Sequence, residues 1–261
     1  MGTDFLFDKA AIVTGASSGI GRATALALAK HGACVALAAR RETALSELAS
    51  EIENLGRKAL ILPTDVTQPD AVEAMAQKVL EQWGRVDILI ANAGEYIQGP
   101  IADLDLADLQ RSLNVNYYGG VYSIKAVLPH MLARKSGHIV AVTSMDGKIG
   151  LPPDAPYVSA KFALTGFLEV LRQEVNDHRI AVTNVMPGRV DTGMIKHLNF
   201  SWVSTKISPE SVARSIIHAI RRRTPIVIVP PQAKLLYYVN VFAPKLSDKL
   251  SRFFRLQGWT E

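Results

Sequence analysis

The sequence holds a single cysteine, Cys34, among its 261 residues, so no disulfide can form within the chain. Chains without disulfides suit a reducing compartment, and we expect a cytoplasmic protein. The six histidines have no metal-ligand spacing with one another or with Cys34, so we predict no metal site. Because Cys34 begins the apolar run C-V-A-L-A-A, we interpret it as a buried and inert thiol.

Long apolar runs and targeting signals are also missing. No stretch of about 18 apolar residues is present, so we expect no membrane-spanning helix. The N-terminus lacks the basic region and apolar core of a secretory signal, and Leu6 breaks the myristoylation pattern. With 48% hydrophobic and 20% charged residues, the composition instead fits one large α/β domain.

The body of the chain lacks an excess of positive charge. From residue 221 onward there are eight Lys or Arg and two Asp or Glu, whereas the first 220 residues hold 21 Lys or Arg and 22 Asp or Glu. The net charge of +5 therefore comes from residues 221–261. We expect no nucleic-acid-binding surface on the body.

Short apolar segments alternate with helical segments along most of the chain. The expected strands are 10–14, 35–39, 59–62, 86–91, 138–143, 180–186 and 226–229, and the expected helices include 22–31, 42–55, 70–83, 104–132 and 157–178. Right-handed crossovers between such strands give a parallel sheet with helices on both faces. We predict a Rossmann-type, doubly wound α/β sheet of about seven strands in a single domain, 1–230, followed by a tail, 231–261.

A glycine-rich loop joins the first expected strand to the first helix. Gly15, Gly19 and Gly21 let the backbone approach a pyrophosphate, and the helix N-terminus offers free N–H groups. The spacing G-x-x-x-G-x-G differs from the commoner G-x-G-x-x-G. Tight turns also need glycine, but the strand–loop–helix context favours nucleotide binding.

Two arginines follow the second expected strand, where a dinucleotide fold places the adenosine ribose. No acidic residue stands there to bind a ribose 2′-hydroxyl, and Arg40 can pair with a 2′-phosphate. The sequence therefore favours NADP(H), with Arg40 a stronger candidate than Arg41. Alternatively, both arginines only flank the helix that follows. Asp65, after the third strand, suits either an adenine amino group or a turn.

Three polar residues with a chemical use lie between Ser144 and Lys161. If Tyr157 opens a helix, Tyr157 and Lys161 share one face as an i,i+4 pair. A phenol has a pKa of about 10, and a nearby ammonium group favours the phenolate. Ser144, at a strand end, could hydrogen-bond the same substrate oxygen. The group suits proton transfer to a carbonyl or from an alcohol, although Tyr157 and Lys161 alone could be an ordinary surface pair.

Further motifs follow other strands. The segment N-A-G begins at Asn92, and P-G-R-V-D-T begins at Pro187. Carboxyl ends of parallel strands meet at one edge of the sheet, so we expect these motifs to converge with Ser144 and the glycine loop. Asn116 lies in L-N-V-N-Y-Y-G-G, whose low helix propensity predicts an irregularity that turns a group inward.

Together these motifs resemble the short-chain dehydrogenase/reductase family over roughly residues 8–195. The resemblance rests on T-G-A-S-S-G-I-G (14–21), D-V (65–66), N-A-G (92–94), N-V-N-Y-Y-G (114–119), T-S-M-D-G (143–147), Y-V-S-A-K (157–161) and P-G-R-V-D-T (187–192). It implies that Tyr157 is the general acid in ketone reduction and that Lys161 lowers the phenol's pKa. Ser144 would orient the substrate oxygen, and Asn116 would hold a water in a proton relay. The implied cofactor-binding residues are Gly15, Ser17, Gly19, Ile20, Gly21, Arg40, Arg41, Asp65, Val66, Asn92, Gly94, Tyr157, Lys161, Pro187, Gly188, Val190 and Thr192.

The sequence departs from the family pattern in two places. The loop after Ser144 carries Asp146 near the expected substrate entrance, and the resemblance gives this carboxylate no role. The C-terminus lacks the glycine- and aspartate-rich strand with which 3-oxoacyl-ACP reductases form tetramers. We therefore expect a homodimer through the helices that carry Asn116 and Tyr157.

The tail has its own pattern. Residues 233–242 are mostly apolar, and beyond Pro244 an apolar stripe (Leu246, Leu250, Phe253, Phe254) is flanked by basic residues (Lys245, Lys249, Arg252, Arg255). Such a helix can rest on an anionic membrane surface, close over a pocket or form a dimer contact. The pattern resembles family members that act on lipids, retinoids or steroids.

We predict an NADP(H)-dependent oxidoreductase that interconverts a ketone and a secondary alcohol, with a hydrophobic or lipid-like substrate. The expected pocket walls are parts of 145–156 and 193–207 and the tail. A 3-oxoacyl thioester is an alternative substrate. A non-catalytic nucleotide sensor or scaffold is an alternative of another class, but it would have no need for the phenol of Tyr157.

Overall fold

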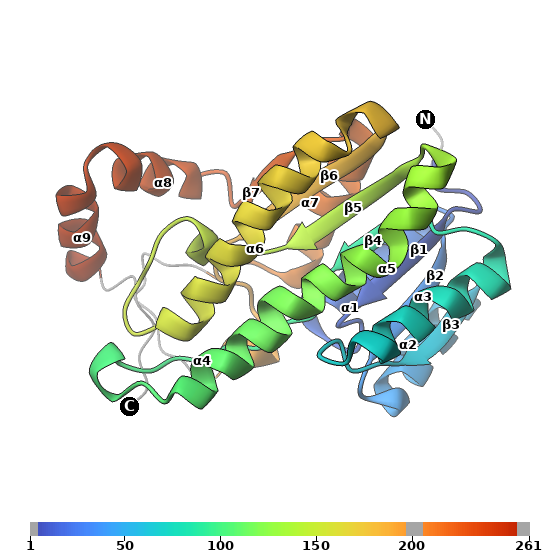
Figure 1. Cartoon of the computed structure of the whole chain (residues 1–261), viewed down its shortest axis with the longest axis horizontal. Coiled ribbons are helices and arrows are strands. Elements are labelled where there is room, and N and C mark those ends of the chain that lie inside the picture. The colour runs from blue at the N-terminus through green and yellow to red at the C-terminus, as the bar shows by residue number, and fades with distance from the viewer. Residues whose placement is uncertain (1–4, 197–205, 255–261) are drawn as a thin grey trace.

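The computed structural model describes residues 5–196 and 206–254 (Figure 1). Within these ranges seven parallel strands form one sheet in the order β3-β2-β1-β4-β5-β6-β7. This is the predicted Rossmann-type fold. The strands are β1 (Ala10–Thr14), β2 (Cys34–Ala39), β3 (Ala59–Pro63), β4 (Ile88–Ala91), β5 (Gly137–Val142), β6 (Ile180–Pro187) and β7 (Ile226–Val229).

Helices cover both faces of this sheet (Figure 1). Helices α1, α2 and α7 pack on one face, and α3, α5 and α6 pack on the other. The α-helices are α1 (Gly19–Lys30), α2 (Glu42–Asn54), α3 (Pro69–Trp83), α4 (Leu106–Leu113), α5 (Gly119–Arg134), α6 (Ala155–Glu174), α7 (Pro209–Arg222), α8 (Ala233–Phe242) and α9 (Pro244–Phe253). The predicted strands and helices are all present, with ends that differ by a few residues.

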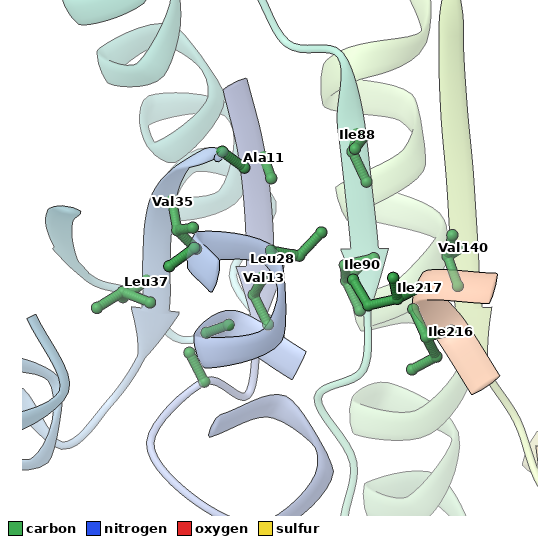
Figure 2. Close-up of a cluster of buried hydrophobic side chains, with 14 of the residues drawn as sticks. Ala11, Val13, Leu28, Val35, Leu37, Ile88, Ile90, Val140, Ile216 and Ile217 are labelled. Carbon is green, nitrogen blue, oxygen red and sulfur yellow. The ribbon is translucent and has the colours of Figure 1, made fainter. Parts of the chain in front are cut away.

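The strands are apolar throughout because both faces of the sheet are buried. In β1, Ala11 and Val13 belong to the core under α1 and α7, whereas Ile12 faces the opposite core. Figure 2 shows side chains of the central strands beside Leu28 of α1. On the other side of the view, Ile90 and Val140 lie beside Ile216 and Ile217 of α7. Each large apolar side chain buried in this way contributes about 1.5–3 kcal/mol to stability.

The order of the strands locates the site. The chain runs outward from β1 through β2 to β3 and then returns to place β4 on the other side of β1. The crossovers therefore diverge between β1 and β4, and ligands of open parallel sheets bind at the carboxyl ends beside such a switch point. The loops after β1, β4, β5 and β6 surround this point.

The predicted irregularity near Asn116 is confirmed. Between α4 and α5 the helix widens into a π-helical turn, Asn114–Tyr118. Asn116 is buried in this turn. A π-turn changes the direction of the side chains that follow it, and this one directs Asn116 toward the segment after β4.

The last two helices lie beyond β7 and extend away from the sheet (red in Figure 1). Pro244 separates them by opening α9. The predicted apolar stripe is divided: Leu250 and Phe254 line a cavity, whereas Leu246 and Phe253 are exposed. Arg255 lies outside the described residues. No helix in the described ranges is long and apolar enough to cross a membrane.

The interpretation of Cys34 as a buried thiol is wrong in part. Cys34 is the first residue of β2 and is partly exposed. Burial and the negative charge of Asp8 still raise the pKa of its thiol, which disfavours the reactive thiolate.

Candidate active site

The glycines of the loop after β1 let its backbone pack closely against the segments that follow β4 and β6. Gly15 has φ +66°, and a Cβ there would lie 2.8 Å from Asn92 Nδ2. Gly19 opens α1 with φ +53°, and a Cβ there would lie 2.9 Å from the Thr192 methyl group. No side chain caps α1, and its first turn holds no acidic residue. The N-terminus of α1 therefore offers N–H groups and a positive dipole end that fit a pyrophosphate.

The adenosine end of the site lies beside β2 and β3. Arg40 and Arg41 directly follow β2 and are exposed at the cavity rim. Arg41 Nη2 donates to Ser17 Oγ at 3.0 Å. Asp65 Oδ1 accepts from the Thr67 N–H at 2.9 Å, and this bond lowers the pKa of Asp65. Asp65 thus forms a turn, as one of its two interpretations predicted, and it also lines the cavity.

Two asparagines hold the backbone around the switch point. Asn92 Nδ2 donates to the Thr14 carbonyl at 2.9 Å, which ties the end of β4 to the end of β1. Asn116 Nδ2 donates to the Glu95 carbonyl at 2.7 Å, and Asn116 Oδ1 accepts from the Glu95 N–H at 3.1 Å. Asn116 therefore clamps the segment after N-A-G. The predicted water relay through Asn116 stays a prediction.

Ser144, Tyr157 and Lys161 come together at the carboxyl end of β5. Tyr157 and Lys161 lie in the first two turns of α6 and are 9% and 3% exposed. Lys161 Nζ lies 5.4 Å from the centre of the Tyr157 ring and donates to the Val142 carbonyl at 3.1 Å. The alternative of an ordinary surface pair is wrong, because both side chains are buried against the strand end that carries Ser144.

The pKa of Tyr157 is raised, opposite to the direction that Lys161 alone would give. Burial of the phenol is the main cause, and the negative charges of Asp146 and Asp154 add to it, while a hydrogen bond with Ser144 acts against them. Burial also lowers the pKa of Lys161 to about 8. The sequence did not predict that these two carboxylates would act on the pKa of Tyr157.

Three further polar residues, Tyr96, Asp146 and Asp154, surround Ser144 and Tyr157. The sequence did not predict that they lie together. Tyr96 donates to Asp154 Oδ1 at 2.5 Å, and its ring meets the Tyr157 ring edge-on at 5.2 Å. Burial raises the pKa of Asp154 to about 6. Asp146 hydrogen-bonds Ser144 rather than standing at the entrance. No local motif signals the Tyr96–Asp154 pair, because the two residues are 58 positions apart.

One cavity of about 1030 Å³ connects these parts. All of the predicted cofactor-binding and catalytic residues line it except Gly21 and Asn116, which lie behind its wall. The far wall is mostly apolar and includes the tail helices. Residues of this wall are Leu151, Met194, Ile195, Leu235, Leu236, Val239, Leu250 and Phe254. The expected wall at 193–207 is seen in part, because 197–205 lie outside the described residues.

Residues 9–201 match the family described as short chain dehydrogenase. The chain belongs to the short-chain dehydrogenase/reductase family. Among curated relatives, it is 34% identical to a protein named "Fatty acyl-CoA reductase" from Acinetobacter baylyi, over 93% of this chain and 82% of that protein. Members of the family are oxidoreductases that bind a nicotinamide cofactor and act on small molecules.

Solved structures agree with this assignment. A family member from Burkholderia phymatum in complex with NAD superposes with a TM-score of 0.85 over 92% of this chain and 95% of that chain, at 24% identity, and shows the fold alone. An alcohol dehydrogenase from Thermococcus sibiricus complexed with 5-hydroxy-NADP has a TM-score of 0.76 and 28% identity, over 85% of this chain and 94% of that chain. One complex holds NAD and the other an NADP derivative, so the neighbours leave open which cofactor this chain prefers.

Proposed function

We propose that the protein is an NADP(H)-dependent oxidoreductase that reduces a hydrophobic ketone to a secondary alcohol. The observation that carries the proposal is the continuous cavity. It joins the glycine-rich loop before α1, the buried Ser144–Tyr157–Lys161 group, and the apolar wall of the tail. A cofactor along the strand ends and a carbonyl against Tyr157 would share this space.

When bound, NADPH supplies the hydride. Tyr157 then gives its phenolic proton to the substrate oxygen, and Ser144 hydrogen-bonds the same oxygen. Lys161, held by the Val142 carbonyl, places positive charge beside the phenol and favours the phenolate that remains. Burial of both side chains excludes water from the proton transfer.

We propose that Arg40 selects NADP(H) by pairing with the ribose 2′-phosphate. Charge-assisted hydrogen bonds contribute about 1.5–3 kcal/mol, so Arg40→Ala is expected to lower the preference for NADPH over NADH by at least about tenfold. The ratio of kcat/KM values for the two cofactors measures this. Arg41→Ala is the matched control with a smaller expected effect, because Arg41 already bonds Ser17. An unchanged kcat/KM ratio in Arg40→Ala would show that Arg40 does not bind the 2′-phosphate.

We propose that the substrate is lipid-like, because tail helices α8 and α9 supply much of the apolar wall. A 3-oxoacyl thioester is the second candidate, and the relative named as a fatty acyl-CoA reductase favours it. The test is NADPH oxidation against ketones of rising chain length, with Tyr157→Phe as the blank. Turnover that rises with chain length supports the apolar pocket, and turnover only on thioester-linked ketones selects the second candidate. NADPH binding without any turnover would favour a sensor.

We propose that residues 1–230 form one domain and that the tail, 231–261, contacts membranes. The outer sides of α8 and α9 are apolar, with Tyr238, Phe242 and Phe253 exposed. Four Lys or Arg and one Asp lie on the same two helices. Apolar side chains flanked by cations suit an anionic lipid surface.

Replacing Phe242 and Phe253 by Ser is expected to reduce sedimentation with phosphatidylserine vesicles at low salt by at least about tenfold, because each phenyl ring contributes about 1.5–3 kcal/mol on burial. The two rings are 82% and 80% exposed, so folding should not suffer. Phe7→Ser, at another exposed phenylalanine, is the control and should sediment like the wild type. Wild-type protein that stays in the supernatant would contradict the membrane proposal.

We propose a homodimer through α5 and α6. The outer side of α6 exposes Phe162 and Val170, and Tyr118 is exposed in the π-turn that precedes α5. Exposed apolar groups of this kind mark interfaces when they lie together. Sedimentation of the full chain as a monomer at micromolar concentration would contradict this arrangement.

A further inference from the structure

The carboxyl group of Asp146 is bonded to the serine of the candidate active site. Ser144 Oγ lies 3.0 Å from Asp146 Oδ2 and accepts from the Asp146 backbone N–H at 3.1 Å. The short turn that carries Asp146 (η3, Met145–Gly147) packs closely against α6, since a Cβ on Gly147 would lie 2.7 Å from Thr165 Oγ1. The turn therefore holds the carboxyl group in place beside Ser144.

The donor and acceptor inventory makes this contact consequential. A serine hydroxyl has one proton to donate, and an ionised carboxylate can only accept. When Asp146 is ionised, Ser144 must donate to it and has no proton left for a substrate carbonyl. When Asp146 is protonated, it can donate to Ser144 Oγ, and the Ser144 proton is then available to the substrate oxygen.

The charges around Asp146 act in both directions. Burial raises the pKa of the Asp146 carboxyl, whereas the Ser144 hydrogen bond and the positive charges of Arg189 and Lys161 lower it, and the net direction is upward. The titratable and charged groups around it are Tyr157 and Lys161 of α6, Asp154 just before α6, Arg189 after β6 and Tyr96 after β4. Ionised Asp146 also raises the pKa of Tyr157.

We propose that Asp146 is a positioning residue for carbonyl reduction, whose neutral carboxyl group donates to Ser144 and thereby directs the Ser144 hydroxyl to the substrate oxygen. When Asp146 is ionised, the Ser144 hydroxyl donates to Asp146 instead, and the hydrogen bond to the substrate oxygen is lost. The inference rests on the proposed ketone reduction. It assigns a role to Asp146, the carboxylate for which the sequence offered none.

The first test is the pH profile of ketone reduction in Asp146→Asn. The amide is close in shape to the carboxyl group and keeps an N–H donor for Ser144 at every pH. In the wild type, kcat/KM is expected to fall as the pH rises through the ionisation of Asp146, by about tenfold one pH unit above the midpoint. Asp146→Asn should lose this fall. Asp154→Asn is the matched control and should keep it, because Asp154 is bonded to Tyr96 instead.

The second test needs no substrate. The infrared spectrum of the wild type minus that of Asp146→Asn should contain a carboxylic-acid C=O band that disappears with rising pH at the midpoint of the kinetic fall. If no ketone is reduced, the proposed function fails while this band still reports on Asp146. The same fall in Asp146→Asn as in the wild type, or no acid band at any working pH, would overturn the inference.

Discussion

Replacing Tyr157 by Phe is expected to lower kcat/KM for ketone reduction by about 10²- to 10⁴-fold, the usual contribution of a positioned acid. The phenyl ring should keep its packing, because the Tyr157 ring is buried and meets the Tyr96 ring edge-on. NADPH binding should remain close to that of the wild type, since the glycine loop and Arg40 are untouched. Fluorescence titration of NADPH and steady-state kinetics separate the two effects.

The same cavity provides a control for this variant. Tyr96 is a second partly buried tyrosine beside Tyr157, and Tyr96→Phe removes a hydroxyl that is bonded to Asp154. It should cost less than about tenfold, because this hydroxyl is committed to a carboxylate rather than to the substrate. Equal losses in the two variants would assign the proton transfer to the pair, and full activity in Tyr157→Phe would end the proposed mechanism.

Asp87→Ala is expected to lower the free energy of unfolding by about 3 kcal/mol, although Asp87 lies far from the chemistry. Asp87 is 5% exposed and accepts from the Ala10 N–H at 3.0 Å and from Arg85 Nε at 2.6 Å. Arg134 Nη2 lies 3.3 Å away. Alanine would leave the β1 amide and two partly buried cations without this acceptor.

Urea unfolding at neutral pH measures the loss, with Glu51→Ala as the control. Glu51 forms an exposed ion pair with Arg22, so its removal should cost less than about 1 kcal/mol. Burial alone would raise the pKa of Asp87, but the Arg85 and Ala10 hydrogen bonds outweigh it and the pKa is lowered. Asp87 therefore stabilises the fold above its unfolded-state pKa of about 3.9, and this contribution disappears as the pH falls through its lower folded-state pKa. A loss in Asp87→Ala no larger than in Glu51→Ala would contradict the prediction.

The sequence by itself determined the fold class and the edge of the sheet at which the site lies. Both follow from local patterns: apolar runs such as Ala10–Thr14 form strands buried on two faces, and the polar motifs directly follow them. Parallel strands then bring Asn92, Ser144 and Pro187 to one edge whatever the exact helix ends. The irregularity at Asn116 was predictable for the same reason, because its low helix propensity is local.

Only the tertiary structure decided how the groups of the site act on one another. The contact between Asp146 and Ser144 depends on the turn that α6 holds in place, and the Tyr96–Asp154 pair joins segments that are far apart in sequence. The direction of the Tyr157 pKa depends on how completely the fold excludes water and on which carboxylates it brings near. The tertiary structure also decided which residues of the apolar stripe in the tail line the cavity and which are exposed. The spacing of apolar residues predicts one face of a helix, but it does not predict what that face packs against. Burial and long-range charge are sums over the whole fold, and no short stretch of sequence contains them.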